Sequence, residues 1–144
     1  LNEEILNYIT IILQYILEDI VISKELRKFY KDRKPICKFN FHKEFYKMFR
    51  LKQKLGITSS VVIFNYENIG SEVLYELEHQ VRALDMFCHV KDKKVIVFLL
   101  PFTGHAGAIA FSKRIGEKFK ELKLLKILEV DKPTPEDTTK EVLK

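Results

Sequence analysis

The sequence predicts an α+β domain in which a split βαβ sheet carries helices on one face and follows a long amphipathic helix. Three observations predict this class. Four short runs rich in apolar or β-branched residues, at 59–66, 86–90, 95–100 and 124–130, have the length of strands. Two longer segments between them, 71–84 and 106–122, place apolar residues at helical spacing. The first 31 residues form a separate helical pattern.

The composition is that of a chain with one main domain, and the balance of charges indicates which kind of ligand it binds. The chain has 144 residues, 47% of them hydrophobic, with 11 Phe and 6 Tyr, which suffices for one substantial core. The net charge of +5 comes from 25 Lys and Arg against 20 Asp and Glu, so both signs are mixed along the chain. Such a balance suits an anionic small ligand better than a nucleic-acid polymer, because polymer binders usually concentrate their charge.

The N-terminal helix is unusually long and amphipathic. Its apolar residues recur at spacings of three and four: Ile5, Ile9, Ile12, Leu13, Ile16 and Ile20. Polar and charged residues interrupt this run too often for a membrane span. We expect the helix to connect to an upstream domain or to form a dimer seam, and the alternative is a helix packed on the rest of this chain.

A second helix is expected over 42–55. Pro35 separates it from the first helix, and Gly56 ends it. Its apolar face comprises Phe41, Phe45, Met48, Phe49 and Leu55. Aromatic residues and lysines interleave along 27–54, a pattern that can bind single-stranded nucleic acid. The aromatics fall at helical spacing, however, so we expect them in the core and the lysines in solvent, with no nucleic-acid polymer as partner.

The remaining elements follow in the order strand, helix, strand, strand, helix, strand. The turn 91–94, with sequence KDKK, joins the strands 86–90 and 95–100 as an antiparallel hairpin, and Pro101 and Gly104 close the second strand. This order is the split βαβ arrangement of ferredoxin-like domains. We therefore divide the chain into a connector helix, 1–34, one domain, 35–131, and a flexible tail, 132–144, rich in proline and charge.

Catalytic and metal-binding signatures are absent from the sequence. It contains no G-x-S-x-G, P-loop, H-E-x-x-H or G-x-G-x-x-G motif, and its four histidines lie on different predicted elements. Cys37 and Cys88 form no C-x-x-C and lie far apart in sequence, so we expect neither a zinc site nor a disulfide, and a reducing, cytoplasmic setting. Cys88 and His89 are adjacent on a strand and should point to opposite faces.

One constellation resembles a known family. Arg82-x-x-Asp85 precedes a strand and a charged hairpin turn, after which come Leu99-Leu100-Pro101, Thr103, Ala108 and Arg114-Ile115. Over about 38–130 this pattern is similar to the GGDEF domain of bacterial diguanylate cyclases. The resemblance implies a GGDEF-like fold, in agreement with the order of elements.

The catalytic part of that resemblance is missing. Where the family has its Gly-Gly-Asp/Glu-Glu-Phe hairpin, this chain has the turn 91–94, whose Lys93 and Lys94 replace glycines and acids. Lysines can neither let a nucleotide approach the backbone closely nor hold a metal. Asn65 and Glu67 stand where the family has metal-binding aspartates, and the phosphate loop is absent between Ile69 and Gly70. Cyclase activity on GTP is therefore expected to be lost.

The part that survives is the family's inhibitory-site motif, which binds cyclic di-GMP. The resemblance assigns ligand binding to Arg82 and Asp85, with Arg114 contributed by the following helix. An arginine fork suits a guanine edge or a phosphate, and a carboxylate accepts from the guanine N1 and N2 donors. No metal or redox cofactor is implied. The alternative for Arg82 and Asp85 is an exposed ion pair at a helix end, which contributes little stability.

Because it keeps this motif in a degenerate GGDEF domain, the chain is similar to the cyclic di-GMP receptor of the Pel exopolysaccharide system. In that receptor the degenerate domain follows a GAF domain. The resemblance implies regulation of exopolysaccharide production or export, with other components of a polysaccharide secretion complex or a second copy as partners. It places the chain in the cytoplasmic portion of an inner-membrane protein, with 1–34 as the closing helix of the GAF domain. The alternative function is a docking or dimerisation module without a small-molecule ligand.

Overall fold

The computed structural model describes residues 2–80 and 86–143. The elements, in chain order, are α1 (Glu3–Phe29), α2 (Phe39–Leu55), β1 (Ser60–Asn65), α3 (Ser71–Gln80), β2 (Met86–Val90), a 3₁₀ turn η1 (Lys91–Lys93), β3 (Val95–Leu100), α4 (His105–Lys118), β4 (Lys123–Glu129) and α5 (Pro135–Thr139). Within the described ranges, no helix is long and apolar enough to cross a membrane.

The four strands form one antiparallel sheet in the order β2-β3-β1-β4. The central strand β1 pairs with both β3 and β4, so that Val62 lies opposite Phe98 on one side and Ile127 on the other. The strand β3 therefore lies between β1 and β2, which are joined through α3. This is the split βαβ topology, and the predicted α+β fold class is confirmed.

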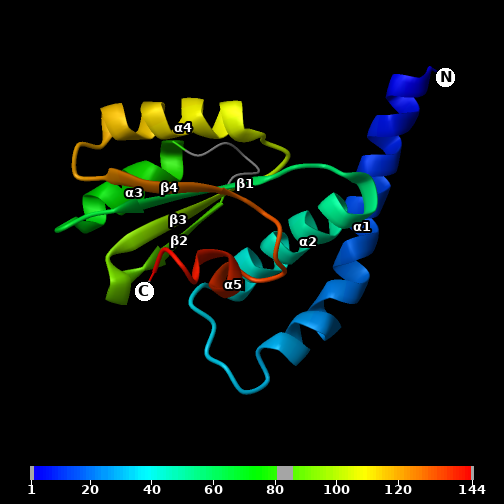
Figure 1. Cartoon of the computed structure of the whole chain (residues 1–144), viewed down its shortest axis with the longest axis horizontal. Coiled ribbons are helices and arrows are strands. Elements are labelled where there is room, and N and C mark those ends of the chain that lie inside the picture. Colours follow the sequence, from blue (N-terminus) through cyan, green and yellow to red (C-terminus); the bar gives the residue numbers. More distant parts are fainter. Residues whose placement is uncertain (1, 81–85, 144) are drawn as a thin grey trace.

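Helices cover both faces of this sheet, with α3 and α4 on one side and α2 on the other (Figure 1). Val62 and Phe64 of β1 pack with α3 and α4, whereas Val61 and Ile63 pack with α2. The expectation of helices on one face is correct for α3 and α4 but wrong for the whole sheet. The reason is that β1 and β3 are apolar on both faces, and a strand buried on both faces needs two covering layers.

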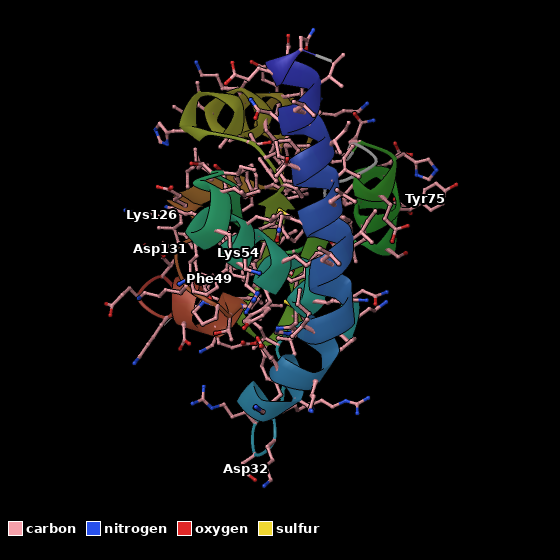
Figure 2. The ribbon with its side chains drawn as sticks, turned by 90° about the vertical axis from the view of Figure 1, so that its right-hand side faces the viewer. Asp32, Phe49, Lys54, Tyr75, Lys126 and Asp131 are labelled. Atoms are coloured by element: carbon pink, nitrogen blue, oxygen red, sulfur yellow. A yellow bond between two sulfur atoms is a disulfide. The ribbon has the colours of Figure 1, made fainter. Side chains whose placement is uncertain are left out.

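The long helix α1 divides into a packed half and an exposed half. Near its C-terminal end, Ile22 and Leu26 are fully buried in a cluster with Tyr46 of α2. Toward its N-terminal end the apolar residues are 42–57% exposed: Ile5, Ile9, Ile12, Leu13 and Ile16. Figure 2 shows α1 running along the front of the molecule to the loop that carries Asp32. The predicted helix is confirmed, and the side chain of Ile20 lies outside the described part.

A buried lysine joins α1 to α2. Lys47 is 2% exposed, its Nζ lies 3.0 Å from Oε1 of Glu44, and it stands 4.1 Å from the centroid of the Tyr15 ring. The Tyr15 hydroxyl donates to Oε2 of the same Glu44, at 2.7 Å. The expectation that the lysines of this region are solvated is therefore wrong for Lys47. At the end of α2, Leu55 is 37% exposed rather than in the core.

The two cysteines form a disulfide, contrary to the sequence-based expectation. Cys37 and Cys88 are 51 positions apart, but their Cα atoms lie 5.6 Å apart and no cysteine is free. The connection between α1 and α2 folds back over β2 and brings Cys37 to it. The prediction failed because separation along the chain is a poor guide to distance in space. The reducing setting was inferred from two free thiols, so the structure no longer supports that inference.

The C-terminal segment is also more ordered than the flexible tail that was expected. The side chain of Thr134 caps α5 by accepting from the backbone N–H of Asp137, and Pro135 occupies the first turn. Thr134 and Thr139 are 2% and 1% exposed. Capping and burial thus fix a segment whose composition alone suggested a linker.

Candidate functional site

Arg114 lies on the flank of α4, beside the C-terminal end of α3. The neighbouring residues Phe111 and Ile115 are buried against the sheet, which leaves Arg114 exposed at the side of the helix. Its Nη2 donates to the backbone carbonyl of Gln80 at 3.4 Å, and its guanidinium carbon lies 5.3 Å from the centroid of the Phe111 ring. These two contacts direct the guanidinium toward α3.

Gln80 is the last described residue before the segment 81–85. Arg82 and Asp85 therefore lie outside the described residues, and of the three expected site residues the structure places Arg114 alone. Arg114 nevertheless contacts the residue two positions before Arg82. Among the residues that the structure does describe, no carboxylate forms an ion pair with its guanidinium.

A cavity of about 820 Å³ runs beside β2, immediately after this segment. It lies between β2, α3 and the start of α2, and its lining includes Cys37, Lys38, Glu78, Met86 and Cys88. Its size is within the range of small-molecule sites, about 300–1,000 Å³. Arg114 does not line it. The sequence did not indicate this cavity, because only the folded path of 36–41 brings that segment to β2.

A second cavity lies beside Asn65 and Glu67, the two residues that the family resemblance placed at metal-binding positions. Asn65 and Glu67 line a cavity of about 360 Å³ together with Lys120, Glu121 and Lys123. The neighbouring turn is exposed, and Lys94 adopts a left-handed conformation with φ of 54°. Within the described residues, no group of three or more His, Cys, Asp and Glu side chains is placed to hold a metal ion.

A tyrosine and a histidine form a polar pair at the same end of the sheet. The Tyr66 hydroxyl lies 2.5 Å from Nε2 of His89, on the face of β2 opposite to Cys88, as the strand alternation predicts. Burial, and secondarily the charge of Lys91, lowers the pKa of His89, while burial raises the pKa of Tyr66. The pair therefore remains neutral at neutral pH and acts as a support of β2.

A second polar cluster, the Tyr30–His42–Glu136 network, fixes the connection between α1 and α2. The Tyr30 hydroxyl lies 2.5 Å from Nδ1 of His42 and donates to Oε2 of Glu136 at 2.6 Å. The backbone N–H of Cys37 donates to Nε2 of His42, and that of Ile36 to Oε1 of Glu136, both at 3.1 Å. Burial lowers the pKa of His42, and burial together with Glu136 raises the pKa of Tyr30.

Comparisons with known proteins agree with this architecture. The chain is similar to the crystal structure of PelD 158-CT from Pseudomonas aeruginosa PAO1, with a TM-score of 0.54 and 18% identity, a likeness that shows the fold alone. The match covers 71% of this chain and 41% of that chain, so this chain spans about two fifths of the solved relative. No curated protein sequence matches. The PelD GGDEF domain family matches residues 35–129, and because this range is more than half of the sequence, the chain belongs to that family.

Proposed function

We propose that this chain is a non-catalytic receptor domain that binds cyclic di-GMP through Arg82, Asp85 and Arg114. One observation carries the proposal: Arg114, 34 residues after Gln80 in sequence, donates a hydrogen bond to its carbonyl. Arg82 follows Gln80 by two positions in the sequence, which supports a site that uses both arginines. Membership of the PelD GGDEF family supports a receptor of this type.

The chemistry of the three side chains fits the ligand. The guanidinium of Arg82 binds a guanine edge or a phosphate as a fork, and the carboxylate of Asp85 accepts from the guanine N1 and N2 donors. Arg114 closes over the second base or a phosphate, and its charge is not used by any described carboxylate. Stacking between the bases of an intercalated ligand dimer supplies further binding energy.

The lysines of the hairpin turn, Lys93 and Lys94, support a receptor rather than an enzyme, because they stand where the family resemblance expects catalytic residues. Lys120 and Lys123 line the cavity that holds Asn65 and Glu67, where a cyclase needs acidic metal ligands. In this proposal, ligand binding changes how the domain docks onto components of a polysaccharide secretion complex, and so regulates exopolysaccharide production or export. The chain acts as the cytoplasmic portion of an inner-membrane protein.

Isothermal titration with cyclic di-GMP tests the site. Arg82→Ala and Arg114→Ala should each weaken binding by about ten- to a hundredfold, because a hydrogen bond to a charged group contributes about 1.5–3 kcal/mol. Lys113→Ala is the matched control, since it removes a positive charge from an exposed neighbour on α4 and should leave binding unchanged. GTP should give no saturable heat. Unchanged affinity in Arg82→Ala would contradict the proposal.

A second candidate function is a homodimer formed through α1, which the exposed apolar face favours. Ile5, Ile9, Ile12 and Ile16 follow one another at spacings of four, three and four, the pattern of a helix that packs on another helix. Light scattering should then show a dimer that the double variant Ile9→Glu, Ile12→Glu abolishes, whereas Asn7→Glu, at an exposed polar residue of the same helix, does not. The dimer hypothesis would be ruled out if the wild-type chain were monomeric both at the highest concentration measured and after 100-fold dilution.

A further inference from the structure

The disulfide between Cys37 and Cys88 joins two parts of the fold that differ in how firmly they are held. Cys88 lies in β2, the edge strand of the sheet, which pairs with β3 on one side only. Across the other side of β2 lies the cavity of about 820 Å³. The disulfide therefore attaches the edge strand β2 covalently to the connection between α1 and α2.

The other end of the disulfide is firmly anchored. The backbone N–H groups of Ile36 and Cys37 donate to Glu136 and His42, and Tyr30 bridges the side chains of those two residues. His42 is 1% exposed. The segment that carries Cys37 is therefore held by α1, α2 and α5 together, and the disulfide ties β2 to these three helices.

Both sulfur-bearing residues border the cavity, which gives a small thiol reagent a path to them. Cys37 and Cys88 are 8% and 6% exposed and contribute to the cavity lining. A dithiol can reduce the bond in two steps. One thiolate attacks a sulfur and forms a mixed disulfide, and the second thiol resolves it. The dithiol gives up two electrons and two protons and becomes a disulfide, and Cys37 and Cys88 become thiols.

We propose that the Cys37–Cys88 disulfide is a redox switch that raises the affinity of this domain for cyclic di-GMP when it is oxidised. The inference rests on the proposed function. Cys88 is the third residue of β2, and this strand begins at Met86, directly after Asp85. A strand held at both sides has less conformational freedom itself, and such preorganisation reduces the entropic cost of binding a ligand next to it. Reduction releases one of the two attachments.

The test compares oxidised chain, chain treated with dithiothreitol, and the double variant Cys37→Ser, Cys88→Ser, each titrated with cyclic di-GMP. A thiol-reactive chromophore first counts free thiols, which should be absent from the oxidised chain and two after reduction. Reduction should raise the Kd about tenfold, and the variant should match the reduced chain. Dithiothreitol should not alter the variant. The reduced wild-type chain makes the comparison independent of how well the variant folds, which far-ultraviolet circular dichroism checks.

The outcomes separate this inference from the function on which it rests. Equal affinity of the oxidised and reduced chains would overturn the switch while leaving the receptor intact. Absence of binding in both states would overturn the receptor and the switch together. Two reactive thiols in the chain after air oxidation would overturn the switch alone, because no disulfide would then form.

Discussion

The protonation state of His42 follows from its hydrogen bonds. Tyr30 uses its one hydroxyl proton to donate to Glu136, so Nδ1 of His42 must donate to the Tyr30 oxygen. Nε2 accepts from the backbone N–H of Cys37 and therefore carries no proton. His42 is thus a neutral imidazole with the proton on Nδ1. A second proton on Nε2 would face the Cys37 N–H donor and a buried setting, and these outweigh the Glu136 carboxylate oxygen 3.6 Å away.

The stability of the domain should consequently fall at mildly acidic pH. The pKa values of His42 and His89 are lower in the folded chain than the ordinary value of about 6.5. The unfolded chain then binds protons more readily, so the free energy of unfolding decreases as pH falls below about 6.5 and is unaffected by these groups above it. Urea unfolding at intervals from pH 8 to 5.5 measures this slope.

Two variants assign that slope to its source. His42→Leu lowers stability at every pH because it leaves the Cys37 N–H without its acceptor, but its pH dependence should be weaker than that of the wild type. His105→Gln, at the exposed start of α4, should keep the wild-type slope. The range stops at pH 5.5 because the hydrogen bond to Lys52 lowers the pKa of Glu129 in the folded chain, so that this carboxyl would also reduce stability at lower pH, near its ordinary pKa. A flat wild-type profile would refute the assignment.

Local rules predicted single residues well where a regular element decides their direction. The opposite directions of Cys88 and His89 follow from strand alternation alone, and Gly56 ends α2 in the left-handed conformation that glycine favours. The burial of Lys47 and the pairing of Cys37 with Cys88 could not be predicted in this way. Both depend on segments that only tertiary packing brings together.

At the scale of elements, the strongest agreement is at the hairpin. The strands β2 and β3 have the predicted bounds, 86–90 and 95–100, because a charged turn and Pro101 interrupt the apolar pattern sharply. The ends of helices agree less well. The helix α4 ends at Lys118 rather than at 122, since Phe119 leaves helical geometry while its side chain remains buried. Burial continues past the end of the helix, so periodicity overestimates its length.

The faces of the elements were harder to predict than their positions. The apolar run of β3, in which all six residues are buried, has no alternation to show which layer each side covers. The second helix was predicted over 42–55 and spans 39–55, but nothing local assigns it to the second face of the sheet. For α1 the periodicity predicts a helix and an apolar stripe, and the structure adds that its contacts with α2 include Tyr15, Ile22 and Leu26, whereas the apolar residues nearer its N-terminus stay exposed.

At the scale of the whole molecule, the candidate site stays a prediction that rests on the resemblance to a family motif. The types and spacing of Arg82, Asp85 and Arg114 led to the GGDEF resemblance, and the family match over 35–129 agrees with it. The cavity beside β2 and the disulfide that borders it carry no family motif and required the folded chain. A sequence motif can indicate which residues bind a ligand. The cavity and the disulfide near those residues, by contrast, are formed by segments that are distant in sequence.

In the Tyr30–His42–Glu136 network, Glu136 comes from the most distant part of the sequence, 106 positions from Tyr30. Its carboxylate accepts from the Tyr30 hydroxyl and the Ile36 N–H, so Glu136→Ala leaves two partly buried donors unpaired. The free energy of unfolding should fall by about 2–3 kcal/mol, as expected for lost hydrogen bonds to a charged group. Asp131→Ala, which removes an exposed carboxylate from the same segment, should change it by less than about 0.5 kcal/mol.

Urea unfolding followed by far-ultraviolet circular dichroism distinguishes the two variants. A flexible tail over 132–144 would make both behave like the wild type, whereas the Tyr30–His42–Glu136 network requires a difference between them. Because the same network anchors the segment that carries Cys37, Glu136→Ala should also increase hydrogen exchange at 36–41 in the oxidised chain. Loss of stability without that increase would mean that α5 stabilises the core through its buried threonines alone, and that the disulfide ties β2 to a segment held by other contacts.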